Sequence, residues 1–336
     1  MLNGNYWSLG YILGTSRALS APYYVNLEPT NHCNLHCTIC SRVNGTPRGY
    51  MSWNVFREIV DQCAALGVRQ VSLFLGGEPT LHADLARMVA YVEQKGLVSG
   101  IHTNATLLTP ELSQDLLRAG LSQISISLDG ETPEEYEQVR KGARFAETKS
   151  NILAFLEAKK GFGERRPHTI IQTIRQFRPE MLDNKGWVHY PDSGEKFNRQ
   201  FQGLPVEEIR VLLPHTWRGE KMDIAHRPPG SVYLRCKHLW MGLSIAWDGQ
   251  VVGCCNDLNR VHLRGSVVDD GLKGIWDGHD ARRLRLLHVK KQHRLIPLCG
   301  DCDEVWRDEH PLRGWLRSRP LWGWARRLLY RATGKP

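Results

Sequence analysis

The 336-residue chain lacks an apolar run of the roughly 18 residues that a membrane-spanning helix needs. It also lacks the composition of a disordered chain, because 41% of its residues are hydrophobic and 24% are charged. The apolar residues within 1–21 are interrupted by glycines and follow no basic residue, unlike a signal peptide. We therefore expect a globular, cytoplasmic protein of one large domain or two ordinary ones.

Acidic residues are absent from the C-terminal end of the sequence. Residues 311–336 carry seven Arg or Lys side chains and supply most of the net charge of +9. The rest of the chain is nearly neutral and shows no nucleic-acid-binding motif, so we expect no nucleic-acid partner. Trp315, Trp322 and Trp324 lie among these arginines, and aromatic rings can stack on bases. Residues 321–330 favour instead a short basic amphipathic helix, which suits peripheral contact with a membrane or docking on the body.

The nine cysteines do not suggest a disulfide framework, because their number is odd and no export signal is expected. Cys63 stands alone within a helical pattern, and we expect it in the core. The other eight fall into two groups, which is typical of metal ligands. The groups are Cys33, Cys37 and Cys40, and then Cys236, Cys254, Cys255, Cys299 and Cys302.

Short β-type runs alternate with helical patterns between residue 23 and about residue 213. Ser52, Asp84 and Thr109 are candidate caps at helix starts, and Gly67 follows the first of these helices. Alternating strands and helices imply parallel pairing, in a doubly wound sheet or a partial α/β barrel. Both architectures place their chemistry at the carboxyl ends of the strands. The predicted strands are 23–27, 70–75, 100–103, 123–128, 169–173 and 208–213.

The first cysteine group forms a C-x3-C-x2-C pattern directly after the first predicted strand. Three closely spaced thiolates can bind three irons of a [4Fe–4S] cubane, and the fourth iron then stays open. The alternative is a structural zinc site with His32 or His36 as fourth ligand. Zinc usually takes two separated pairs of ligands, so the spacing favours the cluster.

This pattern and its position resemble the radical SAM superfamily. The resemblance implies that S-adenosylmethionine chelates the open iron and is cleaved reductively to methionine and a 5′-deoxyadenosyl radical. That radical would take a hydrogen atom from the substrate. The resemblance also implies an electron donor such as flavodoxin or ferredoxin. In such enzymes the protein orients the reactants and excludes water and oxygen.

Two further segments carry the resemblance. Residues 75–80 (LGGEPT) follow the second strand and look like the Gly-Gly-Glu motif of the family, and residues 125–130 (SISLDG) follow the fourth and look like another of its motifs. The resemblance places Gly76, Gly77 and Glu78 at the ammonium group of the methionine part of S-adenosylmethionine. The two glycines would let backbone carbonyls approach this ammonium group, and the Glu78 carboxylate would add negative charge there. Without this context, the Gly-Gly-Glu-Pro sequence would indicate only a turn.

Four more residues are candidates for cofactor or substrate binding by the same resemblance. Ser127 and Asp129 are expected to meet ribose or substrate, with helix capping as the alternative. Asn104 follows the third strand and either reaches the cofactor or makes a turn. Arg140 stands where relatives often direct an arginine toward the methionine carboxylate, although a single arginine is also common on a solvated face.

The second cysteine group lies in a region with a different pattern. Residues 243–247 and 250–253, joined by an Asp-Gly pair, predict a β-hairpin, and a helix is expected near 272–287. Four thiolates can fully ligate a second [4Fe–4S] cluster, with a zinc ribbon as the alternative. The order of these segments looks like the SPASM/twitch extension of radical SAM enzymes, and the cysteines suffice for one auxiliary cluster, as in the truncated twitch form. The expected ligands are Cys236, Cys254, Cys299 and Cys302.

Adjacent Cys254 and Cys255 need different roles in this interpretation. Neighbours on a β-strand point to opposite faces, so we predict that Cys254 is the ligand and Cys255 faces elsewhere. Cys255 would then be a buried small hydrophobe or, as a catalytic residue, the donor of a hydrogen atom to a substrate radical.

These patterns predict a partial (β/α)6 TIM-like barrel followed by a small auxiliary module. The expected regions are an N-terminal extension (1–22), the barrel (23–225), the SPASM/twitch module (226–310) and a basic tail (311–336).

The reaction favoured is dehydrogenation of a small polar or sugar-like molecule, with the auxiliary cluster as electron acceptor. Epimerisation with Cys255 as hydrogen donor and maturation of a ribosomal peptide are alternatives, although about 22 residues before the first strand are too few for a peptide-binding domain in this chain. A non-catalytic iron–sulfur or zinc protein that binds nucleic acid is the alternative from another class.

Overall fold

The computed structural model describes residues 6–42, 46–163, 166–175, 179–184, 195–218, 220–221 and 230–307. The basic tail 311–336 lies outside these residues, so its contact with a membrane stays a prediction, as do the region boundaries. Among the described residues, no helix is both long enough and apolar enough to cross a bilayer.

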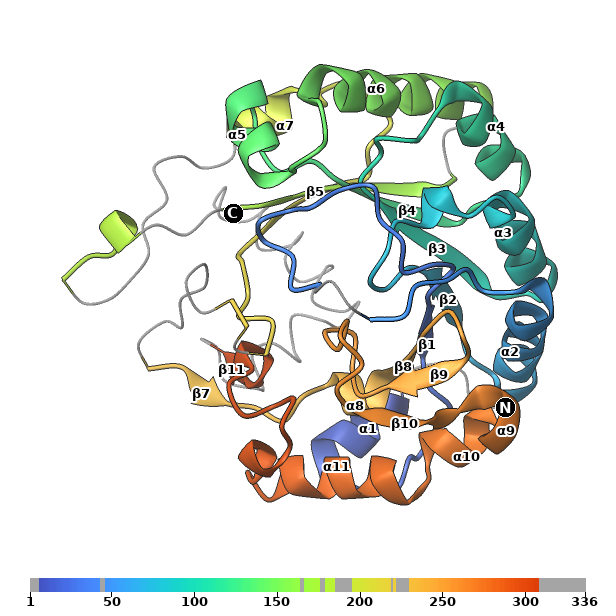
Figure 1. The fold of residues 1–336 in the computed structure, drawn as a ribbon, viewed down its shortest axis with the longest axis vertical. Helices are drawn as coiled ribbons and strands as arrows, with labels where there is room; N and C mark the ends of the chain where they lie inside the picture. Colours follow the sequence, from blue (N-terminus) through green and yellow to red (C-terminus); the bar gives the residue numbers. More distant parts are fainter. Residues whose placement is uncertain are drawn as a thin grey trace, which may run out of the picture.

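Nine strands of the described chain form one sheet, in the order β10-β9-β8-β1-β2-β3-β4-β5-β6 (Figure 1). Its strands β1 to β6 pair in parallel and follow the chain order, as predicted. The prediction of a partial α/β barrel is therefore confirmed. The six strands are β1 (Tyr24–Leu27), β2 (Gln70–Leu73), β3 (Val98–Thr103), β4 (Gln123–Ser127), β5 (His168–Ile174) and β6 (Glu208–Leu212).

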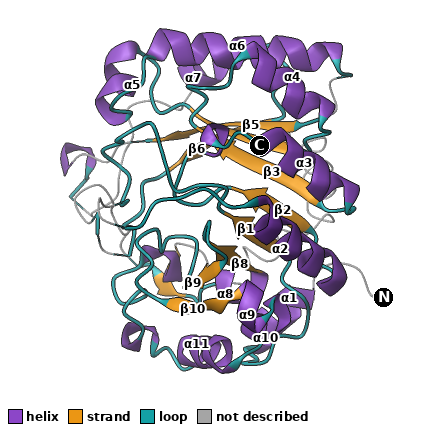
Figure 2. Ribbon diagram, turned by 45° about the vertical axis from the view of Figure 1, so that its right-hand side comes forward, coloured by secondary structure: helices purple, strands orange, loops and turns teal. Residues whose placement is uncertain are grey.

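Helices cover the outer face of this curved sheet (Figures 1 and 2). Ser52 caps α2 by accepting a hydrogen bond from the Val55 amide, and Gly67 ends it with a φ of 85°. Thr109 caps α4 in the same way, whereas the Asp84 side chain makes no capping hydrogen bond to α3. The helices are α2 (Trp53–Leu66), α3 (Leu85–Gln94), α4 (Pro110–Arg118), α5 (Pro133–Val139) and α6 (Phe145–Gly161).

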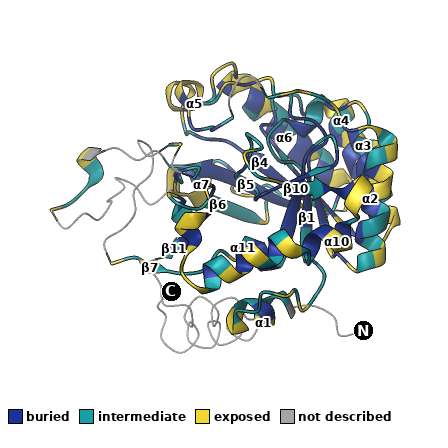
Figure 3. Ribbon diagram, turned by 60° about the horizontal axis from the view of Figure 1, so that its bottom comes forward, coloured by how far each residue is buried: buried dark blue, intermediate teal, exposed yellow. Residues whose placement is uncertain are grey.

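The strands of the barrel have an apolar outer face and a polar inner face. Val25, Val71 and Ile124 belong to the main hydrophobic cluster together with helix residues such as Phe56. Figure 3 shows these strands mostly in the colour of buried residues, behind helices that carry exposed residues. The neighbours of Val25, Val71 and Ile124 along each strand point the other way. Those neighbours are polar side chains, nearly all of them buried: Asn26, Ser72, His102, Ser125, Ser127 and Gln172.

The predicted hairpin forms, and it extends the barrel sheet. Strand β8 (Gly242–Ile245) pairs in parallel with β1 and antiparallel with β9 (Gln250–Val252), which pairs with β10 (Leu263–Ser266). The helix predicted over 272–287 is in fact two helices, α10 (Leu272–Trp276) and α11 (His279–Val289), because the chain leaves the helix at residues 277–278. The shorter elements are α1 (Tyr6–Leu13), η1 (Pro79–Leu81), η2 (Pro179–Met181), α7 (Glu195–Arg199), β7 (Val232–Tyr233), α8 (His238–Met241), α9 (Val267–Asp270), η3 (His293–Leu295), η4 (Asp303–Val305) and β11 (Trp306–Arg307).

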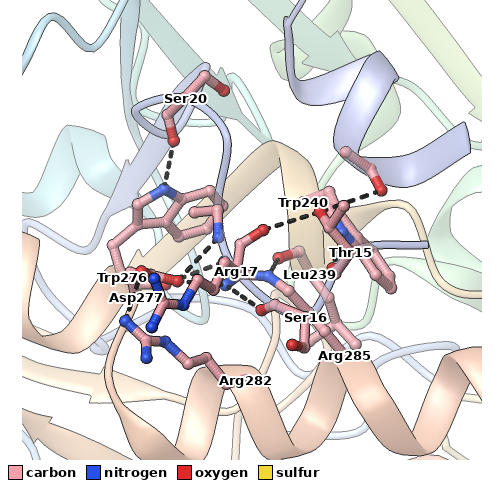
Figure 4. Close-up of polar contacts among 12 residues, drawn as sticks. Thr15, Ser16, Arg17, Ser20, Leu239, Trp240, Trp276, Asp277, Arg282 and Arg285 are labelled. Carbon is pink, nitrogen blue, oxygen red and sulfur yellow. Dashed lines mark hydrogen bonds and ion pairs between the residues drawn. The ribbon is translucent and has the colours of Figure 1, made fainter. Parts of the chain in front are cut away.

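Arg285 of α11 holds the N-terminal segment against the auxiliary module (Figure 4). Its guanidinium is fully buried and donates to the carbonyls of Leu239 (2.8 Å), Trp276 (2.9 Å) and Ser16 (3.3 Å). Burial lowers the pKa of Arg285 to about 10, so the side chain keeps its charge at neutral pH. The indole of Trp276 donates in turn to the Ser20 carbonyl at 2.7 Å.

We expect the Arg285→Ala substitution to destabilise the protein by about 3 kcal/mol, because it leaves buried carbonyls without donors. Arg283 lies on the same helix with its side chain half exposed, so Arg283→Ala should change stability by no more than about 0.5 kcal/mol. Urea unfolding of both variants measures the difference. Equal losses in the two variants would show that the buried network adds nothing to stability.

Candidate active site and auxiliary metal centre

The three cysteines of the first group lie on one loop at the carboxyl end of β1. Cys33, Cys37 and Cys40 are partly exposed free thiols. The buried Leu35 anchors the loop between them, and its carbonyl accepts from Arg42 at 3.0 Å. Burial raises the pKa of the Cys33 thiol, so binding of a metal must displace its proton. The loop thus presents three sulfur ligands at the edge where barrel enzymes perform chemistry.

The Gly-Gly-Glu segment packs directly against the cysteine loop. A Cβ atom on Gly77 would lie 2.1 Å from the Thr30 carbonyl oxygen and 2.5 Å from that of His32. The Glu78 amide also donates to the His32 carbonyl at 2.8 Å. Only glycine at position 77 permits this approach.

The Glu78 carboxylate, predicted near the cofactor, is buried and engaged within the protein. It accepts hydrogen bonds from the Thr80 hydroxyl, the Thr103 hydroxyl and the Asn104 amide, each at 2.7 Å. Burial raises the pKa of Glu78, and these donors lower it in part. The side chain therefore fixes the end of β3 against the Gly-Gly-Glu loop.

Asn104 connects the end of β3 to the cysteine loop. Its side-chain amide donates to the Oδ1 atom of Asn34 at 3.0 Å, and Asn34 lies between Cys33 and Cys37 in the sequence. Its Oδ1 atom accepts from the Thr106 amide at 2.9 Å, which also makes it a turn residue.

Arg140 and Asp129 form a buried ion pair beside Cys37. Arg140 Nε donates to Asp129 Oδ2 at 2.7 Å, and Nη1 lies 3.8 Å from the Cys37 sulfur. Burial alone lowers the pKa of Arg140, but Asp129 and Cys37 raise it above its ordinary value. Asp129 Oδ1 accepts from the Ile174 amide of β5 at 2.7 Å. The pair places a fixed positive charge next to a predicted cluster ligand.

His102 is a candidate functional residue that the sequence analysis missed. It lies on the inner face of β3, and its Nε2 atom is 3.0 Å from the Ser127 hydroxyl. Burial lowers the pKa of His102 to about 4, with smaller contributions from Arg140 and Arg210, so the ring is neutral at pH 7. His102 directly precedes Thr103 and Asn104 at the end of β3, and this position in the sequence could have indicated that it lies near the site.

Glu28, also missed, joins the barrel to the auxiliary hairpin. Its buried carboxylate accepts from the Gly76 amide at 2.9 Å and from the Trp247 amide at 3.3 Å. The Trp247 ring covers Gly49, where a Cβ atom would lie 2.4 Å from the indole. The hairpin turn therefore contacts the loops that frame the first cysteine group.

The five cysteines of the second group line one cavity. Burial raises the pKa of Cys236, Cys254 and Cys302 to about 12. Both Cys254 and Cys255 line this cavity, so the cavity does not distinguish them, and the expectation that Cys254 is the ligand stays a prediction. Strand β9 ends at Val252, and the alternation of side chains ends with it.

Among the described residues, no three His, Cys, Asp or Glu side chains converge on a single-ion site. Cubane ligands bind separate irons and therefore lie farther apart than the ligands of one ion. The five thiols that line one cavity suffice to ligate a cubane completely, which fits an iron–sulfur cluster.

Sequence comparison supports both halves of this arrangement. Residues 27–166 match the model of the radical SAM superfamily, and residues 236–303 match an iron–sulfur cluster-binding domain named SPASM. A protein from Pyrococcus furiosus, described as a tungsten-containing aldehyde ferredoxin oxidoreductase cofactor-modifying protein, is 33% identical over 333 residues, covering 83% of this chain and 86% of the relative. The chain belongs to the radical SAM superfamily. This radical SAM protein therefore binds S-adenosylmethionine, the [4Fe–4S] cluster that holds it, and an auxiliary cluster, as predicted.

Solved structures show the same fold at low sequence identity. SuiB of Streptococcus suis, bound to its precursor peptide SuiA, has a TM-score of 0.62 at 16% identity, covering 91% of this chain and 76% of SuiB. BtrN, solved with AdoMet and 2-DOIA, has a TM-score of 0.57 at 16% identity, covering 84% of this chain and 94% of BtrN. The radical SAM barrel with an appended SPASM module is therefore a shared architecture.

Proposed function

We propose that this radical SAM enzyme oxidises a small polar, sugar-like substrate by two electrons. The observation that carries the proposal is the polar inner face of the barrel. Asn26 Nδ2 donates to the Ser244 hydroxyl at 3.4 Å, and the Ser125 hydroxyl donates to Gln172 Oε1 at 3.0 Å. These uncharged groups can exchange partners with the hydroxyl groups of a polyol.

In this proposal each cysteine group holds one cluster. Cys33, Cys37 and Cys40 would hold the first, and Cys236, Cys254, Cys299 and Cys302 the second. When bound, these groups and S-adenosylmethionine would supply a radical that removes one hydrogen atom from a carbinol carbon, and an acceptor for the electron left behind. Gly76, Gly77 and Asn104 border the cysteine loop where S-adenosylmethionine would bind, while Glu78 supports that loop. Ser127 would orient the substrate, and Asp129 would keep Arg140 in place.

His102 would accept the proton that leaves the substrate hydroxyl. Its ring is neutral at pH 7, and Nε2 is held by Ser127. The Nδ1 atom, which no hydrogen bond within the described residues engages, would receive the proton in the tautomer whose Nε2–H donates to the Ser127 hydroxyl. A base must lie within hydrogen-bonding reach of the proton that it takes, and His102 lies on the polar inner face of the barrel sheet, beside Ser127.

Epimerisation is the second candidate because of where Cys255 lies. Besides the cluster cavity, Cys255, like Cys254, lines a neighbouring cavity together with Tyr24 of β1 and Ser244 of β8. Burial raises the pKa of the Cys255 thiol, and an S–H group is what a hydrogen-atom donor needs.

A peptide is the alternative substrate class, since SuiB was solved with its precursor peptide.

Mass spectrometry of products formed in D2O separates these reactions. The reduced, reconstituted enzyme is incubated with S-adenosylmethionine and a panel of sugars, cyclitols and aminocyclitols. Dehydrogenation gives a product that has lost two hydrogen atoms, together with deoxyadenosine. Epimerisation gives an isomer that carries one solvent deuterium at carbon. Turnover of peptides alone would contradict the small-molecule proposal.

We expect Cys255→Ala to leave dehydrogenation within about twofold of the parent rate, because the thiol takes no part in that reaction. An epimerase would instead keep deoxyadenosine formation and lose the deuterated isomer. Iron analysis of the variant provides the control, since the four proposed ligands are unchanged. A loss of auxiliary iron would identify Cys255 as the ligand in place of Cys254.

A further inference from the structure

His288 of α11 is a buried imidazole beside the auxiliary cysteines. It is 0% exposed and lines the same cavity as Cys236, Cys254 and Cys299. The auxiliary module was expected to supply only sulfur ligands there, and neither the sequence motifs nor the proposed reaction gives this ring a role.

The hydrogen bonds of His288 define its tautomer. The Cys236 backbone amide, which can only donate, points at Nδ1 from 3.2 Å. The Tyr233 hydroxyl lies 3.2 Å from the same nitrogen and donates to the His288 carbonyl at 2.9 Å. Nδ1 is therefore the acceptor, and the neutral ring carries its proton on Nε2.

The Nε2–H group has no acceptor among the described residues, although it is buried. A buried donor without a partner is costly, and proteins seldom leave one. The two other histidines that line the cavity differ in this respect. His238 Nδ1 lies 2.6 Å from the Tyr24 hydroxyl, and His262 Nε2 lies 3.0 Å from Asp280.

We propose that His288 Nε2–H donates a hydrogen bond to a sulfur atom of the auxiliary cluster. The ring is a tuning residue rather than a ligand, because ligation through Nε2 would need the proton on Nδ1, where the Cys236 amide already donates. The Cys236 amide orients the ring. His288 therefore connects the backbone of Cys236, a proposed ligand, to the cluster that the Cys236 thiolate holds. A hydrogen bond to sulfur stabilises the more negative, reduced cluster and raises its reduction potential.

The test is a redox titration of the auxiliary cluster, followed by electron paramagnetic resonance, in a full-length chain whose Cys33, Cys37 and Cys40 are alanine. His288→Leu should shift the reduction equilibrium about tenfold toward the oxidised cluster, which is about 59 mV for one electron. His288→Gln offers an amide N–H and should recover more than half of the shift.

His293→Leu is the matched control, because His293 stacks on Tyr233 in the same aromatic group but does not line the cavity. It should leave the potential unchanged. An unchanged potential in His288→Leu, or equal shifts in the His288 and His293 variants, would overturn the proposal. So would loss of cluster iron from both His288 variants, which would make the ring a ligand or a structural support.

A second measurement does not depend on the stability of His288→Leu. Protein labelled with ¹⁵N-histidine should show a weak nitrogen coupling to the reduced cluster by electron–nuclear double resonance. The coupling should disappear in His288→Gln and persist in His293→Leu. Its absence from the parent protein would refute the hydrogen bond.

Discussion

Replacing Cys33, Cys37 and Cys40 together by alanine is expected to abolish formation of 5′-deoxyadenosine. The three sulfur atoms come from one loop at the end of β1, and alanine offers no ligand for iron. The auxiliary cysteines lie in a separate cavity and are unchanged. Iron content after anaerobic reconstitution should therefore fall from about eight to about four atoms per chain, since each cubane holds four irons.

Cys63→Ala is the matched control for this triple variant. Cys63 is fully buried in α2, and burial raises its thiol pKa to about 12, as expected for a core residue. The control should keep all the iron and the deoxyadenosine yield of the parent. Iron and sulfide analysis, with chromatography of the nucleoside after chemical reduction, measures both quantities. Deoxyadenosine from the triple variant above the protein-free background would show that the first cluster lies elsewhere.

Gly77→Ala is expected to weaken binding of S-adenosylmethionine by about 100-fold, or about 3 kcal/mol. The new methyl group would lie 2.1 Å from the Thr30 carbonyl oxygen and 2.8 Å from the Asn31 Cα atom. Both are backbone atoms, which cannot rotate away as a side chain can. The Gly-Gly-Glu loop must therefore move off the cysteine loop, and overpacking of this kind costs about 1–3 kcal/mol or more.

Gly274→Ala tests whether this effect is specific. A Cβ atom at Gly274 of α10 meets nothing within 4 Å, and alanine is the better helix former. This control should bind S-adenosylmethionine as the parent does, with equal or slightly higher stability. Equilibrium binding to the reconstituted variants, with thermal unfolding of the apo proteins, separates a local change from general misfolding. Parent-like affinity in Gly77→Ala would mean that the two loops do not shape the cofactor site.

The local patterns of the sequence predicted the parallel strands and the main helix ends. Ser52 and Thr109 cap their helices as expected, because an N-cap hydrogen bond spans only three residues. Asp84 has the right residue type but no capping bond, since its backbone angles at the start of α3 differ from the extended ones of a cap. The sequence also did not predict the break between α10 and α11. Asp277 lies in this break, and its carboxylate accepts a hydrogen bond from the amide of the distant Ala18, a contact that no local pattern shows.

The sequence by itself determined which metal groups this protein binds, because the spacing of cysteines on short segments limits which metal groups they can share. The tertiary structure alone decided which distant groups meet. Glu28 joins Gly76 to Trp247 across more than 200 residues, because β8 pairs with β1. The same packing brings His288 to Cys236 and turns Glu78 inward. Such contacts depend on how strands and helices close around a core, and no local pattern encodes that closure.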